Sequence, residues 1–147
     1  MASTACRFAA AALVVPALAA CHGNAPQVAD AWLSLPVSDA GYAQGYFSFR
    51  NPGDRAVSIV GVSCYSFLRT YLSNSDTPID APSVSEVPVA PHASVRLAPG
   101  GLHLQLYQPN HSLTAGERLP CSLTLRDAQG SQSLDFKLEV RAPSATK

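Results

Sequence analysis

Alternation of apolar and polar residues is the dominant pattern of this chain, and it is clearest after a Pro-Gly-Gly turn signal in the second half. There, Leu102, Leu104 and Leu106 occupy every second position, with His103 and Gln105 between them. Successive side chains of a strand point to opposite faces. The pattern therefore predicts a half-buried strand that presents an imidazole and a carboxamide on one outward face.

Comparable short runs recur along the chain, separated by turn residues such as Gly, Asn, Asp and Pro. They cover residues 31–36, 45–50, 56–64, 83–89, 94–97, 119–126 and 133–141. A further alternating run, 67–72, precedes a polar segment, 73–82, that is expected to be a loop. We find no convincing helix in the mature chain. About eight or nine short strands predict an all-β fold, a single antiparallel β-sandwich.

The first 20 residues have the pattern of a signal peptide, with Arg7 before a short apolar run. The run closes with Leu-Ala-Ala-Cys, which is typical of a bacterial lipobox and predicts lipidation of Cys21. The alternative is an ordinary secretory signal with a coincidental cysteine. His22, rather than Asp, follows the cysteine and favours the outer membrane. We expect a tether at 21–29, a domain at 30–141 and a tail at 142–147.

The remaining cysteines form an even pair in an oxidising compartment. Cys6 leaves with the signal peptide and Cys21 takes the lipid, so Cys64 and Cys121 remain. We predict a disulfide between these two residues. The alternative is two independently buried thiols.

Charge and composition exclude several functions. The chain has 10 basic and 10 acidic residues and no block of like charge, which argues against binding to nucleic acid. No arrangement of Ser, His, Cys or carboxylates is typical of a catalytic site, so we expect no enzyme activity.

Three segments carry a resemblance to a known family. They are Gly45–Asn51, Ser94–Leu104 and Leu113–Leu125, with Ala31-Trp32 opening the domain. In these segments the chain resembles the periplasmic copper chaperones called PCu(A)C, from residue 31 to about residue 140. The resemblance implies a cupredoxin-like, Greek-key β-sandwich.

The resemblance also implies a copper site, which this sequence lacks in large part. Members of the family bind Cu(I) through two His and two Met and pass it toward the copper centre of cytochrome oxidase. His103 occupies one His position, whereas Gln105 and Ala81 stand where the family has Met. The other His falls near Thr70 or Tyr71. Met1 is the only methionine, and Cu(I) prefers soft thioether sulfur, so we expect Cu(I) binding to be weak or absent.

Other ligands remain open at this point. His92 and His111 lie in loops that flank the His103 strand, and reduced Cys64 and Cys121 would be soft ligands. The sequence thus predicts a periplasmic, lipid-anchored, copper chaperone-like protein at the inner leaflet of the outer membrane. Its partner would be a copper-receiving oxidase assembly protein. The alternative is a metal-free β-sandwich interaction module of the cell envelope.

Overall fold

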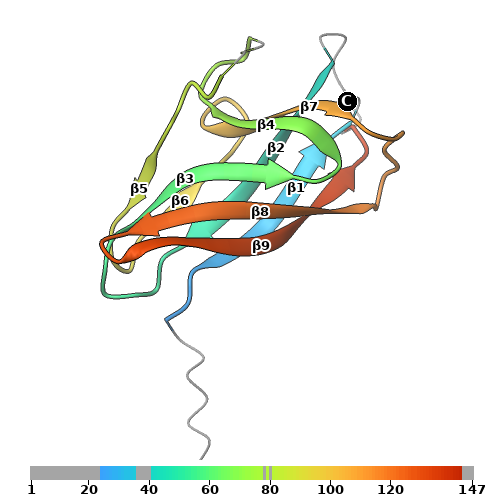
Figure 1. Cartoon of the computed structure of the whole chain (residues 1–147). Coiled ribbons are helices and arrows are strands. Elements are labelled where there is room, and N and C mark those ends of the chain that lie inside the picture. Colours follow the sequence, from blue (N-terminus) through green and yellow to red (C-terminus); the bar gives the residue numbers. More distant parts are fainter. Residues whose placement is uncertain (1–23, 36–40, 78, 80, 144–147) are drawn as a thin grey trace, which may run out of the picture.

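The computed structural model describes residues 24–35, 41–77, 79 and 81–143, and the described chain is built of β-strands (Figure 1). The predicted signal peptide, the predicted lipidation site Cys21 and residues 144–147 lie outside the described residues. The strands are β1 (Gln27–Ser34), β2 (Tyr42–Arg50), β3 (Val57–Cys64), β4 (Phe67–Ser73), β5 (Val87–Val89), β6 (Ser94–Arg96), β7 (His103–Pro109), β8 (Arg118–Asp127) and β9 (Gly130–Arg141). Within the described residues, no helix is long and apolar enough to span a membrane.

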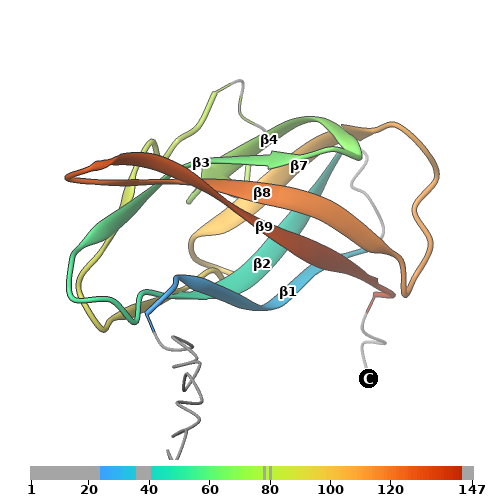
Figure 2. The same ribbon diagram turned by 60° about the horizontal axis from the view of Figure 1, so that its bottom comes forward.

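These strands form one continuous sheet in the order β4-β7-β2-β1-β9-β8-β3-β5, with β6 paired to β2. The sheet curls until its two halves face each other, as Figures 1 and 2 show. The all-β prediction is confirmed, with one correction: β1 and β9 run parallel, with Trp32 opposite Glu139. Alternation of side chains is the same in either strand direction, so the sequence pattern could not reveal this pairing.

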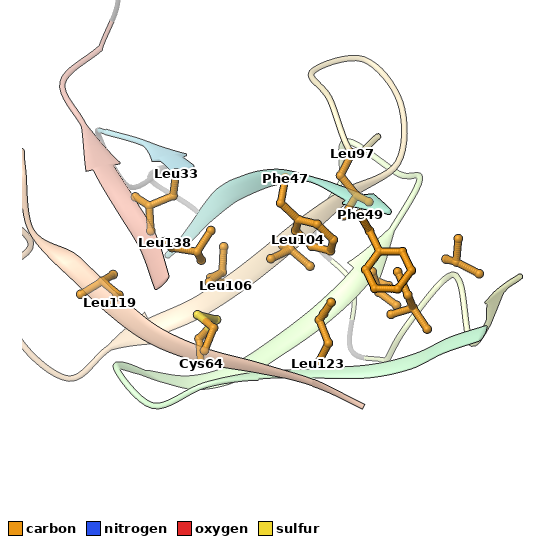
Figure 3. Close-up of a cluster of buried hydrophobic side chains, with 14 of the residues drawn as sticks. Leu33, Phe47, Phe49, Cys64, Leu97, Leu104, Leu106, Leu119, Leu123 and Leu138 are labelled. Atoms are coloured by element: carbon orange, nitrogen blue, oxygen red, sulfur yellow. A yellow bond between two sulfur atoms is a disulfide. The ribbon is translucent and has the colours of Figure 1, made fainter. Parts of the chain in front are cut away.

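The core lies between the two halves of the sheet (Figure 3). Alternate residues of each strand enter it, and the fully buried aromatic and aliphatic side chains include Leu33, Phe47, Phe49, Leu104, Leu106, Leu123 and Leu138. Leu104 and Leu106 therefore fix one face of β7 against the core, as their spacing predicts. This packing holds the other face of the same strand in a defined position.

The predicted disulfide is confirmed. Cys64 at the end of β3 lies directly opposite Cys121 in β8, with 4.1 Å between their Cα atoms and 2.07 Å between their sulfur atoms. Both side chains are buried. The bond therefore crosslinks neighbouring strands that are 57 residues apart in the sequence.

The first strand begins earlier than the sequence pattern predicts. β1 starts at Gln27, inside the segment expected to be a tether, because Gln27 pairs with Arg50 of β2. The register then shifts between Ala29 and Trp32, and Asp30 has a φ angle of 49°. Pairing with β2, rather than alternation of its own residues, thus determines where β1 begins.

Candidate functional site

β7 carries the candidate site, and it is buried on both faces. His103 and Gln105 are 1% and 0% exposed, although they lie on the face opposite the core residues Leu104 and Leu106. The two side chains share a face, as their spacing predicts. The expectation that this face points outward is wrong, because part of the segment between β4 and β5 folds back and binds to it.

Gln105 holds that segment through its carboxamide. Its Nε2 donates to the carbonyl oxygens of Ser75 (2.7 Å) and Thr77 (2.9 Å). Its Oε1 accepts a hydrogen bond from the Tyr107 hydroxyl (2.5 Å), which in turn accepts one from the backbone N–H of Ile79 (2.7 Å). Both N–H groups of the carboxamide are therefore occupied by the chain itself.

Tyrosine rings extend the network along the same face. The Tyr42 hydroxyl donates to the backbone carbonyl of Asp76 (2.8 Å), and its ring lies 5.4 Å from that of Tyr107. The Tyr71 ring meets Tyr107 edge-on at 5.8 Å. Burial is the largest cause that raises the pKa of Tyr42, and the neighbouring Tyr107 and Asp76 raise it further. Burial also raises the pKa of Tyr46. Both phenols are therefore protonated at neutral pH and remain hydrogen-bond donors.

His103 has one nitrogen engaged and one unpaired. Its Nδ1 lies 2.7 Å from the carbonyl oxygen of Gly101. A carbonyl only accepts, so Nδ1 donates this hydrogen bond, and in this tautomer Nε2 has the lone pair. Nε2 is buried and has no hydrogen-bond partner among the described residues, and the ring lies 6.5 Å from that of Tyr46. This lone pair is a possible donor for a soft metal ion.

Three of the four positions implied by the family resemblance meet on neighbouring strands. In the β4–β7 register, Tyr71 lies opposite Gln105 and Thr70 lies opposite Leu106, while His103 is two positions along β7 from Gln105. The Thr70 hydroxyl is buried without a partner within the described part of the chain. Ala81 is exposed on the segment between β4 and β5. Three of the four positions thus lie together, and none of them carries a thioether.

The alternative ligands are engaged elsewhere. His92 Nε2 lies 2.8 Å from Asp54, and His111 Nε2 lies 2.6 Å from Glu117. Cys64 and Cys121 are oxidised in the disulfide described above. In residues 24–35, 41–77, 79 and 81–143, no group of three or more His, Cys, Asp or Glu side chains could hold a metal ion.

These donors do not fit Cu(I), which is soft and prefers sulfur or imidazole ligands. One imidazole nitrogen is available at His103, whereas the Gln105 amide is hydrogen-bonded and its oxygen is a hard ligand. Sequence reasoning also missed the cover formed by Ser75, Thr77 and Ile79. The polar residues of a segment do not indicate which groups they will bind. The tyrosines of β2 and β7 are the one feature of the sequence that indicated a second buried face.

The sequence of the described strands matches a known family. The family described as "Putative lipoprotein LpqE-like" matches residues 27–138, most of the described chain, and the chain belongs to this LpqE-like family. No curated protein matches the sequence.

Solved structures show that the fold is that of PCuAC domains. The apo PCuAC domain from PmoF1 is 22% identical, with a TM-score of 0.67, and the match covers 82% of this chain and 97% of that one. The copper-bound PCuAC domain from PmoF2 is 23% identical, with a TM-score of 0.65 over 82% and 96% of the two chains. Cu(I)-bound DR1885 from Deinococcus radiodurans is 16% identical, with a TM-score of 0.55 over 82% and 78%. The resemblance found in the sequence is thereby confirmed.

Proposed function

We propose that this chain is a non-enzymatic, lipid-anchored envelope protein with the PCuAC fold, in which a hydrogen-bonded cover replaces the copper site. The observation that carries the proposal is the use of the Gln105 carboxamide to bind the carbonyls of Ser75 and Thr77. A methionine at this position would offer a soft sulfur, whereas the carboxamide closes the site with the protein's own backbone. Cu(I) affinity is therefore weak or lost.

A restoring variant tests this proposal. It combines Ala81→Met and Gln105→Met with a histidine introduced at Thr70 or Tyr71, and it keeps His103. We expect the restored domain to hold Cu(I) against a chelator that strips the unmodified domain. A matched control carries the same three changes together with His103→Ala. Equal Cu(I) retention by the unmodified and restored domains would contradict the proposal.

A second candidate function is copper handling with ligands lent by a partner. The observation that favours it is the buried Nε2 of His103, which has no hydrogen-bond partner within the described residues and offers one imidazole ligand. A copper-receiving oxidase assembly protein would supply the others. Cu(I) binding that appears only when the partner is present, and disappears in His103→Ala, would support this candidate over a metal-free interaction module.

Lipid anchoring is the second part of the proposal. The Leu-Ala-Ala-Cys sequence that ends at Cys21 and the lipoprotein description of the family support it. The location would be the periplasm, at the inner leaflet of the outer membrane. A Cys21→Ser precursor should not be acylated and should leave the membrane fraction. Unmodified, soluble wild-type protein would contradict this part alone.

A further inference from the structure

Three turns gather at the end of the sheet where the chain enters β1. They are residues 51–56, 90–93 and 127–130. The Asn51 N–H donates to the Ala93 carbonyl (2.9 Å), and Ser58 at the start of β3 lies opposite Arg126 at the end of β8. We call this end, defined by the three turns, the tether pole; Figure 2 shows it at the left of the molecule.

The first described residue, Asn24, lies at this pole. Asn24 and Pro26 line a cleft of about 340 Å³ together with Asn51 and Gly53. The Asn24 carbonyl oxygen lies 3.6 Å from the point where a Cβ on Gly53 would stand. Only residues 22 and 23 separate Asn24 from Cys21. Three Cα–Cα steps span at most about 11 Å, whatever their conformation.

The opposite end of the sheet, the far pole, consists of Leu35, the turn at Tyr65 and the loop 109–117. The Leu35 N–H donates to the carbonyl of Arg141 at the end of β9, and Tyr65 N–H donates to Pro120. The eight residues of β1 lead from one pole to the other and would span about 23 Å if fully extended. This length is about twice the largest separation of Cys21 from Asn24.

We infer that the acylated protein stands on the bilayer with its tether pole against the lipid headgroups and its far pole toward the aqueous phase. This inference rests on the lipidation of Cys21 proposed above. The connection from Cys21 to Asn24 spans at most about 11 Å and is shorter than the domain. The lipid on Cys21 therefore keeps the tether pole at the headgroup layer. The occupant of this surface is thus the hydrated headgroup region of the protein's own membrane.

The chemistry of the two poles agrees with this orientation. The tether pole exposes polar and charged residues of both signs, among them Asp54, Arg55 and Gln129, which suit hydrated headgroups without insertion. The large hydrophobic side chains that are exposed in the described residues are Tyr65 (67%) and Leu68 (69%), both near the far pole. If these two side chains entered the bilayer instead, the domain would have to lie on its side.

A pair of labelled variants of the full chain tests the orientation. Gln129→Cys places a fluorophore in the β8–β9 turn of the tether pole, and Ser112→Cys places it in the far-pole loop; both residues are exposed. Each precursor is expressed in bacteria, purified from membranes, checked by mass for acylation at Cys21, labelled and reconstituted into vesicles. The vesicles contain lipids with a nitroxide at the headgroup, which quenches nearby fluorophores.

We expect strong quenching of the fluorophore at position 129 and little quenching at position 112. Insertion of a ten-residue Gly/Ser spacer between Gly23 and Asn24 should abolish the quenching at position 129. Equal quenching at both positions, stronger quenching at 112, or no effect of the spacer would overturn the inferred orientation. An unacylated Cys21 would instead refute the proposed lipid anchor, and the mass measurement separates these two failures.

Discussion

Gln105→Met removes the contacts that hold the covering segment on β7, and its cost follows from the structure. The variant loses two hydrogen bonds to Ser75 and Thr77 and the acceptor of Tyr107. Ser75 is half-buried and Thr77 is exposed, so water replaces the carboxamide at their carbonyls. The net value of about 1 kcal/mol per hydrogen bond therefore applies to these two bonds, and the buried Tyr107 hydroxyl, left without its acceptor, costs at least about as much, which gives about 3 kcal/mol in total.

Burying a thioether in place of the carboxamide offsets part of this loss, by about 1 kcal/mol. We expect a net destabilisation of about 2 kcal/mol, which corresponds to a fall in Tm of roughly 10 °C for a domain of this size. Urea unfolding followed by circular dichroism measures it. Hydrogen exchange at the Ile79 amide, which donates to Tyr107, should accelerate at the same time.

Gln132→Met is the matched control, because it makes the same chemical change at a residue that is exposed on β9 and belongs to no buried network. The control should stay within about 0.5 kcal/mol of the unmodified domain. If Gln105→Met is as stable as Gln132→Met and the Ile79 amide exchanges at its original rate, the carboxamide does not hold the cover.

Three further perturbations have defined outcomes. Reducing the Cys64–Cys121 disulfide, or changing both cysteines to Ala, should lower the free energy of unfolding by about 2–4 kcal/mol because the bond closes a long loop; unchanged urea midpoints would contradict this. Leu104→Ala should lower the free energy of unfolding by about 2–5 kcal/mol in the same assay, because Leu104 is 0% exposed in the core. A loss no larger than that of Leu68→Ala, at an exposed leucine, would refute the assigned packing. The hydrogen bond from His111, followed by that from the Thr114 N–H, lowers the pKa of Glu117 below 4.5. The ionised Glu117 carboxylate therefore stabilises the fold above that pH, and this contribution is lost as the pH falls below it. Glu117→Gln should make the unfolding midpoint less sensitive to acid, and identical acid profiles of the two proteins would argue against the His111–Glu117 pair.

The core was predictable because it depends on alternation alone. Leu104 and Leu106 lie where their spacing places them, and the disulfide follows from an even pair of cysteines in an oxidising compartment. The start of β1 was not predictable, because Gln27 is ordered by pairing with Arg50 rather than by its own pattern.

The state of the candidate site was only half predictable. The spacing of His103 and Gln105 fixes a common face, but it does not indicate what covers that face. The cover consists of backbone carbonyls at Ser75 and Thr77. Backbone groups carry no sequence signal, so a buried polar network built on them is visible only in the folded chain.

Competition for Cu(I) between the mature domain and a strong chelator tests the central claim most directly. The account predicts that the unmodified domain loses Cu(I) to the chelator, and that His103→Ala changes this little. Retention of one Cu(I) per domain against the chelator, abolished by His103→Ala, would contradict the account and would require that the cover at Gln105 open to admit the metal.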